Sequence, residues 1–320
     1  MTIETIDRPD EQTRAAARAV QENALAADGT APFSEHVVLS WAPNAVPAGE
    51  RHLLARTATG QPVGYAFLDA TGSAEFAVDP AHRRQGHGRA LLELLKVELA
   101  ELAELAELAD RADLALVHAE ADAEATPQLR IWSHGDQPGA RALAAAAGYR
   151  VVRELLQLRR SLDQQFPGPA EIPLPAGMIL RGFRPGADDE AWLRLNARAF
   201  AYHPEQGRMT QADLAARMAE PWFEPAGFLI AEQDGVMTGF HWTKVHPDGL
   251  GEVYVLGVDP DRHGGGLGRA LTLAGLQHLY RRGVRTVLLY VEADNAAALA
   301  LYQRLGFSTW NADVMYASDH

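Results

Sequence analysis

Two segments of this chain repeat each other, and the repeat limits the folds that the chain can adopt. Residues 78–91 read VDPAHRRQGHGRAL and residues 258–271 read VDPDRHGGGLGRAL, with eight of fourteen positions identical. Each half also closes a helical stretch with glycine and an aromatic residue, at Gly148-Tyr149 and Gly306-Phe307. A structural unit that occurs twice predicts two copies of one fold. The 320 residues accommodate two domains of about 100–200 residues each.

Four prolines mark the junction between the halves, in SLDQQFPGPAEIPLPAG. Proline fits poorly inside a helix or a central strand. We therefore predict an N-terminal domain over residues 1–160, a proline-rich linker over residues 161–177 and a C-terminal domain over residues 178–320. Strand-like and helix-like runs alternate in each half, which predicts an α/β fold for each. Residues 98–108, ELAELAELAEL, predict a helix with no steady apolar face and therefore a solvent-exposed extension.

The composition excludes several classes of function. A net charge of −13 disfavours binding to the phosphate backbone of nucleic acids. Without cysteine there are no disulfides or thiolate zinc sites, and His203, His241 and His246 lack the spacing of a metal site. No apolar run reaches the roughly 18–20 residues of a membrane span, and the charged first residues do not resemble a secretory signal. We expect a cytoplasmic monomer without a metal, a nucleic-acid partner or a membrane partner.

The second repeat lies between a predicted strand and a predicted helix. EVYVLGV, residues 252–258, is β-branched and apolar, and Asp259-Pro260 ends it. A glycine-rich turn follows, and then the helical run RALTLAGLQHLYRR. This order presents backbone N–H groups and a helix N-terminus to an anion. The spacing fits neither the Rossmann nor the P-loop motif, and a tight connection without a ligand remains the alternative.

These residues resemble the acetyl-CoA pyrophosphate loop of the GNAT N-acetyltransferase superfamily. NAAALALYQRLGF, residues 295–307, is similar to the asparagine-led helix of the same superfamily. The resemblance implies two tandem GNAT domains, each an α/β fold with a mixed sheet, that use acetyl-CoA and no metal. His263 departs from the usual Arg or Gln, whereas the first half has Arg83 there. The implied acetyl-CoA contacts are Leu256, Gly257, Val258, His263, Gly264, Gly265, Gly266, Leu267, Gly268, Arg269, Asn295, Ala296, Ala297, Ala298, Leu299 and Ala300 in the second half, and Phe76, Ala77, Val78, Arg84, Gln85, Gly86, His87, Gly88 and Arg89 in the first.

Two side chains of the second half are candidates for acid–base catalysis. We take Glu252 as the general base and Tyr302 as the general acid toward the CoA thiolate, with backbone N–H groups of residues 256–258 polarising the carbonyl. Counting along the repeats aligns Glu252 with Gly72 and Tyr302 with Ala144. The first half therefore lacks both candidates, which predicts a non-catalytic domain. The alternatives are a solvated strand end for Glu252 and a core aromatic for Tyr302.

The chain as a whole resembles the mycothiol synthase family. The stretches that carry the resemblance are GTAPFSEHV (29–37), RAFAYHPEQG (198–207), GFHWTKVHPDGLGEVYVLGVDP (239–260) and LLYVEADNAAALALYQRLGF (288–307). The resemblance implies transfer of acetyl from acetyl-CoA to the cysteine α-amine of cysteinyl-glucosaminyl-inositol, a small thiol-sugar. It also implies substrate contacts at Glu35, Glu205, Lys244, Glu252 and Tyr290. Acetylation of another amine, or a CoA-binding sensor without catalysis, remains the alternative.

Overall fold

The chain forms two compact units. The computed structural model describes residues 1–42, 49–114, 128–163, 172–201 and 204–318. Unit 1 comprises Met1–Leu155 and Ala312–His320, and unit 2 comprises Leu156–Asn311. This division differs from the predicted domains at the C-terminus, because the last strand of the chain pairs with a strand of unit 1. Residues 164–171 of the predicted linker lie outside the described residues.

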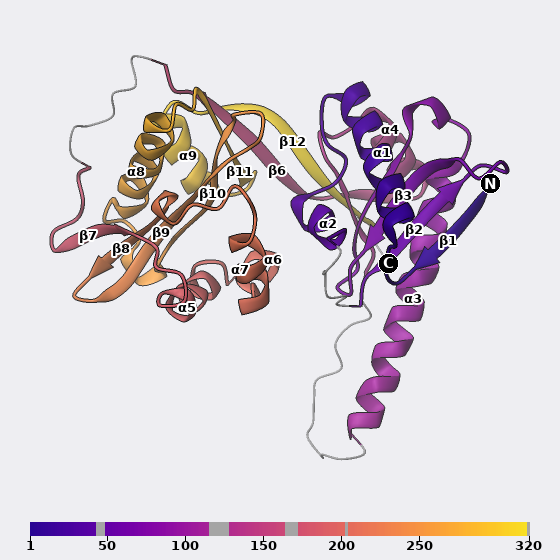
Figure 1. The fold of residues 1–320 in the computed structure, drawn as a ribbon, viewed down its shortest axis with the longest axis horizontal. Helices are drawn as coiled ribbons and strands as arrows, with labels where there is room; N and C mark the ends of the chain where they lie inside the picture. Colours follow the sequence, from indigo (N-terminus) through magenta and orange to yellow (C-terminus); the bar gives the residue numbers. More distant parts are fainter. Residues whose placement is uncertain (43–48, 115–127, 164–171, 202–203, 319–320) are drawn as a thin grey trace. The chain divides into compact units, whose positions relative to one another are not determined.

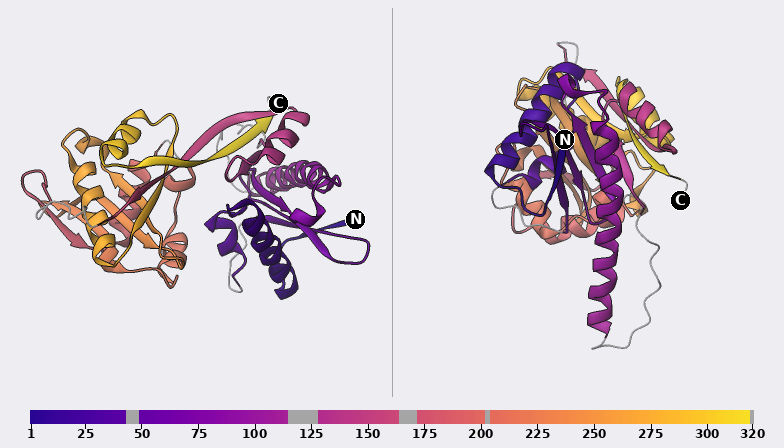
Figure 2. Two further views of the ribbon diagram at one scale, coloured as in Figure 1. Left: turned by 90° about the horizontal axis from the view of Figure 1, so that it is seen from above. Right: turned by 90° about the vertical axis from the view of Figure 1, so that its right-hand side faces the viewer.

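Unit 1 is a sheet covered by helices on both faces, with the strand order β1-β2-β3-β4-β5-β12-β6. Its strands are β1 (Thr2–Ile6), β2 (Arg51–Arg56), β3 (Pro62–Leu68), β4 (Ser73–Val78), β5 (Arg130–Ser133), β6 (Tyr149–Ser161) and β12 (Ser308–Ser318), and its helices are α1 (Glu11–Asp28), α2 (Glu35–Ser40), α3 (His87–Leu114) and α4 (Pro138–Ala146). Helices α1 and α3 lie on opposite faces of this sheet (Figure 2). The α1 face buries Val20 and Tyr65, and the α3 face buries Leu53 and Leu95.

Unit 2 has the same layered arrangement, with the strand order β12-β6-β11-β10-β9-β8-β7. Its own elements are β7 (Met178–Gly182), α5 (Asp189–Ala199), α6 (Pro204–Gly207), α7 (Gln211–Met218), β8 (Phe228–Gln233), β9 (Val236–Val245), β10 (Gly251–Val258), α8 (Leu267–Arg281), β11 (Thr286–Glu292) and α9 (Ala296–Arg304). Helices α5 and α7 cover an aromatic cluster around Trp192 and Trp242. Helices α8 and α9 cover the other face, around Leu276 and Val287. The predicted α/β fold with a mixed sheet in each half is confirmed.

Strands β6 and β12 contribute to both units. The division between the units falls at Leu155/Leu156 within β6 and at Asn311/Ala312 within β12. The second part of β12 pairs antiparallel with β5 of unit 1, from Val314↔Ser133 to Ala317↔Arg130. The fold of unit 1 is therefore completed by residues from the far end of the chain.

The helix predicted over residues 98–108 is confirmed as part of α3. Its first residues pack on the sheet, since Leu99 is 6% exposed. Further along, Leu105 is 53% exposed and Leu108 is 59% exposed, and the helix projects beyond the strands of unit 1 (Figure 1). This agrees with the absence of a continuous apolar stripe in the sequence.

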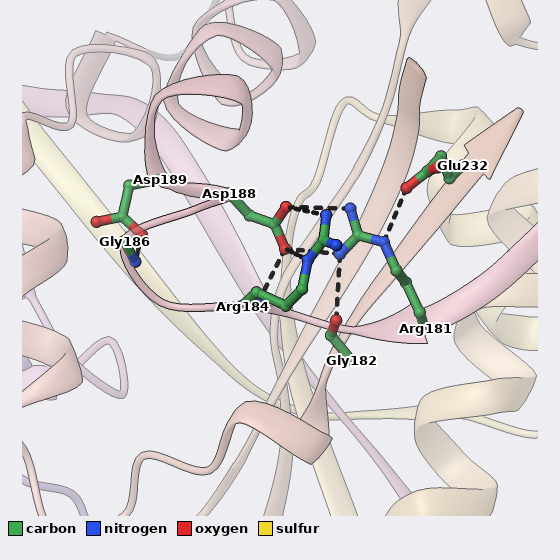
Figure 3. Close-up of polar contacts among 7 residues, drawn as sticks. All are labelled: Arg181, Gly182, Arg184, Gly186, Asp188, Asp189 and Glu232. Carbon is green, nitrogen blue, oxygen red and sulfur yellow. Dashed lines mark hydrogen bonds and ion pairs between the residues drawn. The ribbon is translucent and has the colours of Figure 1, made fainter. Parts of the chain in front are cut away.

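A buried carboxylate fixes the turn between β7 and α5 (Figure 3). Asp188 is 3% exposed and accepts hydrogen bonds from Arg181 Nη1 at 2.6 Å and from the backbone N–H of Arg184 at 2.8 Å. Arg181 Nε donates to Glu232 on β8 at 2.8 Å. Burial raises the pKa of Asp188, but the hydrogen bonds from Arg181 and Arg184 outweigh it and lower the pKa to about 2. The turn between β7 and α5 is therefore held by a carboxylate that is ionised at neutral pH.

Candidate active site

The glycine-rich turn of unit 2 leads into the N-terminus of α8. After β10, a short 3-10 helix (Pro260–Arg262) carries the chain to Gly264 and Gly266, which have φ angles of 84° and 83°. Gly266 is the N-cap of α8, and no side chain caps the helix there. A Cβ at Gly264 or Gly266 would meet nothing within 4 Å. Backbone N–H groups that face open space at a helix N-terminus form an anion site.

Unit 1 repeats the backbone geometry of this turn. Gly86, at φ 88°, stands in the place of Gly266, and Arg84 stands in the place of Gly264. Arg84 has a φ of 62°, so it adopts the left-handed conformation that glycine adopts in unit 2. The conformation of the glycine-rich turn is therefore retained in both units, despite the change of residue.

The departure of His263 from the usual GNAT residue has a structural explanation. His263 Nε2 lies 3.3 Å from the carbonyl oxygen of Val258, the last residue of β10. In unit 1, Arg83 Nε donates to the carbonyl oxygen of Val78, the last residue of β4, at 3.1 Å. His263 and Arg83 thus make the same contact with the end of a strand.

The turn of unit 1 opens into a cavity of about 620 Å³. Of the nine residues predicted to contact acetyl-CoA in this half, eight line the cavity: Phe76, Ala77, Val78, Arg84, Gly86, His87, Gly88 and Arg89. The apolar part of the cavity wall includes Trp132, Leu143 and Tyr149. A cavity of this size lies in the usual range for small-molecule and cofactor sites, about 300–1,000 Å³.

We call the glycine-rich turn, residues 83–88 in unit 1 and 263–268 in unit 2, the cradle. In both units the parallel strands beside the cradle separate after three residue pairs. The paired residues are Gly251↔Val287, Glu252↔Leu288 and Val253↔Leu289 in unit 2, and Ser73↔Arg130, Ala74↔Ile131 and Glu75↔Trp132 in unit 1. Strand β10 continues to Val258 beyond this ladder. The fork between β10 and β11 therefore has a strand edge whose backbone groups are available to a ligand.

A β-bulge distinguishes β10 from its counterpart β4. The register between β10 and β9 shifts between Val253 and Val255, so Tyr254 is the extra residue. The register between β4 and β3 runs without a shift from Ala74 to Val78. A bulge bends its strand and redirects side chains, and bulges are frequent beside active sites. The two forks thus differ in backbone shape as well as in side chains.

The bulge also changes which residue of unit 1 corresponds to Glu252. Counting along the sequence aligns Glu252 with Gly72, but this count ignores the extra residue in β10. The strand registers align Val253 with Ala74, and therefore Glu252 with Ser73. Serine is not a carboxylate, so unit 1 has no counterpart of the candidate base.

Glu252 lies near the start of β10, where it is 7% exposed. Its Oε2 atom lies 2.8 Å from Nε2 of His246. Its cross-strand neighbour on β9 is Lys244. Lys244 Nζ lies 4.6 Å from the ring centroid of Trp222 and 5.1 Å from that of Tyr254. The carboxylate of Glu252 therefore contacts the imidazole of His246. Its cross-strand neighbour, Lys244, packs against two aromatic rings.

Tyr302 lies on α9 and is 7% exposed, in edge-to-face contact with Phe307. Burial raises the pKa of Tyr302 to about 12. The hydroxyl is therefore protonated at neutral pH, which a general acid requires. Asn295, at the start of the asparagine-led stretch, caps the same helix by accepting a hydrogen bond from the backbone N–H of Ala298 at 3.1 Å.

Glu252 and Tyr302 belong to opposite faces of the sheet of unit 2. A Cβ on Gly251 would meet Leu279 of α8 at 3.2 Å, so the side chain of the next residue, Glu252, points to the face of α5 and α7. Tyr302 packs in the cluster beneath α8 and α9. The sheet, with the fork between β10 and β11, lies between these two side chains.

Unit 1 has a buried ionic cluster at the corresponding fork. Nδ1 of His134 lies 2.9 Å from Asp313 Oδ2, and its Nε2 lies 3.3 Å from Glu75 Oε2. Glu75 also accepts the backbone N–H of Ser34 at 2.6 Å, and Asp313 accepts that of Gly135 at 2.8 Å. Burial lowers the pKa of His134, but the hydrogen bonds and charges of Asp313 and Glu75 outweigh it and raise the pKa to about 10. Both carboxylates are thus committed to one imidazolium.

The remaining substrate contacts implied by the resemblance lie in three different elements. Glu35 is the first residue of α2 in unit 1. Glu205 lies in α6, and its side chain is outside the described part of the chain. Tyr290 on β11 is 42% exposed, and its hydroxyl accepts a hydrogen bond from Gln157 Nε2 at 2.7 Å.

Sequence reasoning missed several residues around Glu252. It considered His246 only as a metal ligand, and it assigned no role to Trp222, Tyr254 or Arg217. Arg217 Nε donates to the Tyr254 hydroxyl at 2.9 Å. The alternation of β9 could have identified His246, because residues 240, 242, 244 and 246 of FHWTKVHP share one face of an extended chain. Trp222 and Arg217 come from outside this hairpin and had no comparable signal.

The residues that the structure describes contain neither a metal site nor a membrane-spanning helix. Within these residues, no group of three or more histidine, aspartate or glutamate side chains is placed to hold a metal ion. The helices formed by the same residues include none that is both long and apolar enough to cross a membrane.

Comparison with known proteins identifies the class to which both units belong. The profile of the Acetyltransferase (GNAT) family matches residues 191–307, and that of the Acetyltransferase (GNAT) domain matches residues 48–125. With its two cradles and two forks, the chain is a tandem GNAT acetyltransferase. It is 52% identical over 301 residues to the mycothiol acetyltransferase of Salinispora arenicola, which covers 91% of this chain and 88% of that protein. The chain belongs to the mycothiol acetyltransferase family.

Further relatives agree with this family and with the tandem fold. The mycothiol acetyltransferase of Thermomonospora curvata is 48% identical over 305 residues, covering 94% of this chain and 92% of that protein. A GCN5-related N-acetyltransferase from Sphaerobacter thermophilus has a TM-score of 0.68 at 26% identity, over 99% of this chain and 95% of that one. A tandem GNAT protein from the clavulanic acid biosynthesis pathway has a TM-score of 0.66 at 22% identity, over 99% and 98%, and shows the shared fold.

Proposed function

We propose that unit 2 transfers acetyl from acetyl-CoA to the cysteine α-amine of desacetylmycothiol, cysteinyl-glucosaminyl-inositol, giving mycothiol and CoA. The observation that carries the proposal is the combination found in unit 2 alone. In unit 2 the bulged strand β10 leads into the proposed phosphate cradle and forms the fork with β11. Glu252 lies on one face of this sheet and Tyr302 on the other. Identity of about half the residues to mycothiol acetyltransferases over most of the chain supports this acceptor.

Each catalytic group of unit 2 has a defined task in this reaction. Glu252 accepts a proton from the ammonium group of the acceptor, directly or through water, which frees the amine to attack the thioester carbon. Backbone N–H groups of residues 256–258 polarise the thioester oxygen. As the N–C bond forms and the C–S bond breaks, Tyr302 gives its proton to the leaving thiolate. An α-amine ordinarily titrates at about pH 7.7–8.0, so a carboxylate base is sufficient near neutral pH.

The cradle residues carry the proposed binding of acetyl-CoA. The free N–H groups at the start of α8 would hold the pyrophosphate, and Gly264 and Gly266 leave the space that it needs. We propose the same for unit 1, where the predicted contact residues line one cavity. Because Ser73 and Ala144 replace the acid–base pair there, unit 1 would bind acetyl-CoA without turning it over.

For the acceptor we propose contacts with Glu35, Glu205, Lys244, Glu252 and Tyr290. A sugar–inositol ligand offers many hydroxyl groups, which carboxylates, an ammonium group and a phenol can satisfy. Lys244 is preoriented by the rings of Trp222 and Tyr254, so little side-chain entropy would be lost when it donates to the acceptor.

Mass spectrometry of a reaction with acetyl-CoA and cysteinyl-glucosaminyl-inositol tests the proposal. We expect one acetyl group on the cysteine nitrogen and one equivalent of released CoA. Preference for a polyamine or a peptide N-terminus over this acceptor would assign the enzyme to another amine. Absence of turnover with every amine would instead favour a CoA-binding protein without catalysis.

A further inference from the structure

The hairpin between β9 and β10 holds an imidazole that the proposed mechanism does not yet use. His246 directly follows β9. Its backbone N–H donates to the carbonyl oxygen of Leu250 at 2.8 Å, and its own carbonyl accepts the N–H of Gly249 at 2.9 Å. These two hydrogen bonds fix the backbone of His246 at the start of the turn, so the position of its side chain is constrained.

The imidazole of His246 contacts the carboxylate of the candidate base, Glu252. Its Nε2 atom lies 2.8 Å from Oε2 of Glu252, and the two side chains are 29% and 9% exposed. An ionised carboxylate only accepts hydrogen bonds, so the imidazole Nε2 carries the hydrogen of this contact. One carboxylate oxygen is thereby committed to His246, which orients the other oxygen for the proton of the amine.

We propose that His246 is a positioning residue that orients the Glu252 carboxylate and sets the pH range in which Glu252 can act as a base. This inference depends on the proposed role of Glu252. A neutral imidazole donates the hydrogen bond without adding charge, whereas an imidazolium places a full positive charge against the carboxylate. That charge stabilises the ionised carboxylate and weakens it as a proton acceptor. Turnover therefore falls when His246 is protonated.

The other charged groups near Glu252 belong to side-chain types that titrate elsewhere. Lys244 is its cross-strand neighbour, and Tyr254 binds Arg217 of α7. In the turn, Asp248 accepts the backbone N–H of Leu250 at 3.0 Å. Lysine, tyrosine and arginine ordinarily titrate at about pH 10 or above, and aspartate near pH 4. Only imidazole ordinarily changes charge between about pH 5 and 8.

Two substitutions separate the hydrogen bond from the charge. His246→Gln places an amide N–H near the position of Nε2, so it keeps the donor but does not titrate. His246→Leu removes the donor and keeps comparable bulk. For each variant, kcat and kcat/KM are measured from about pH 5 to 8 with acetyl-CoA and desacetylmycothiol. The same acceptor is used throughout, so its own titration is common to all profiles.

The proposal predicts different results for the two variants. His246→Gln keeps kcat at neutral pH within about threefold of the wild type and declines less at acid pH, because no imidazolium forms. His246→Leu lowers kcat by about 10–100-fold, because the carboxylate is no longer oriented. The KM for acetyl-CoA stays unchanged in both, since neither substitution touches the cradle. If His246 had only a structural role, His246→Gln would not reduce the decline of kcat at acid pH, which is the acid limb of the profile.

His278→Gln is the matched control. His278 is another partly buried histidine of unit 2, and its Nε2 atom lies 3.4 Å from Oε2 of Glu224. It lines a cavity of about 390 Å³ and has no place in the proposed mechanism. This variant should keep the wild-type profile, which shows that loss of an arbitrary histidine–carboxylate pair does not change the acid limb.

Specific outcomes overturn the inference. His246 has no positioning role if His246→Gln keeps the wild-type acid limb, or if folded His246→Leu turns over at the wild-type rate. If His246→Leu does not fold, as judged by its melting temperature, the profile of His246→Gln decides the question. Failure of the wild type to acetylate desacetylmycothiol is a separate result and counts against the proposed function. The variant ratios are then measured with whichever amine the wild type accepts.

Discussion

The two units share the turn that would hold a pyrophosphate and differ at the fork where acyl transfer would occur. Both end a strand at a 3-10 turn and enter a helix through a glycine with positive φ, Gly86 or Gly266. Unit 2 then has a bulged strand, Glu252 and Tyr302. Unit 1 has a regular strand, with Ser73 and Ala144 at those positions. Under the proposed mechanism, the comparison assigns binding of CoA to backbone conformation that both units share, and turnover to a few side chains and one extra strand residue that only unit 2 has.

Removal of Glu252 or Tyr302 should have the largest effect. It tests most directly whether these two side chains account for the difference between the units. Tyr302→Phe and Glu252→Gln should each slow turnover by about 10²–10⁴-fold, the usual contribution of a general acid or base. The affinity for acetyl-CoA, measured by titration calorimetry, should change little, because neither side chain belongs to the cradle. Tyr280→Phe on α8 is the control and should keep full activity. Wild-type rates in both catalytic variants would place the chemistry elsewhere.

The buried cluster of unit 1 should dominate the stability of that unit. His134→Gln leaves Glu75 and Asp313 without their cation, and loss of one partner of a buried ion pair costs about 3–5 kcal/mol. The raised pKa of His134 means that the cluster contributes fully below the ordinary histidine pKa of about 6.5, and that this contribution is lost as pH rises through about 10.

Thermal melts of wild type and His134→Gln between neutral pH and about pH 10 test this. The difference in stability between the two proteins should shrink as pH rises, while turnover by unit 2 at neutral pH is retained. A difference that does not depend on pH would mean that His134 is neutral in the fold.

Unit 2 has the opposite sensitivity to pH. The pKa of Asp188 is lowered to about 2, so its ion pairs with Arg181 and Arg184 contribute fully above the ordinary aspartate pKa of about 3.9 and are lost as pH falls through about 2. Asp188→Asn should destabilise unit 2 by about 1.5–3 kcal/mol at neutral pH, the usual size for hydrogen bonds to a charged group. Denaturant titrations at neutral pH and near pH 3 should show the difference shrinking in acid. Equal destabilisation at both values would contradict the assignment.

The matched pair Gly86→Val and Gly266→Val should have the smallest effect and sharpens the comparison. Both glycines have positive φ, where a residue with a Cβ costs about 1–2 kcal/mol. We expect the substituted turn to relax when empty and to regain the positive φ on binding, which lowers the affinity for CoA by about 5–30-fold. Gly266→Val should weaken the site of unit 2 and reduce turnover at limiting acetyl-CoA. Gly86→Val should weaken only the site of unit 1 and leave turnover intact. Unchanged calorimetric binding in both variants would mean that the cradles are misplaced.

The sequence predicted the parts of the site that are contiguous in the chain. The strand, glycine-rich turn and helix of the cradle lie within residues 252–281, and the N-cap Asn295 lies at the start of its own helix. Backbone conformation can be read from such local patterns, because glycine and proline constrain it directly. The α/β fold of both halves followed from the same local signals.

Features that depend on strand register or on distant contacts could not be predicted. The alignment of Glu252 with Gly72 failed by one residue because a bulge is invisible to counting along the sequence. His134 and Asp313 are 179 residues apart in the chain, and nothing local to either residue points to the other. The contact of His246 with Glu252 spans only six residues; the alternation of β9 places His246 on the correct face, but the contact itself depends on where the hairpin turns back.

The sharing of β12 between the units has a consequence for how the protein is made. Asp313, which holds His134, and the strand beside β5 lie after the whole of unit 2 in the order of synthesis. On the ribosome, the first unit therefore emerges with a gap in its sheet and with His134 lacking one of its two carboxylate partners, Asp313. It can complete its sheet only after all of unit 2 and the second part of β12 have been synthesised, so unit 1 is translated first but cannot be completed first.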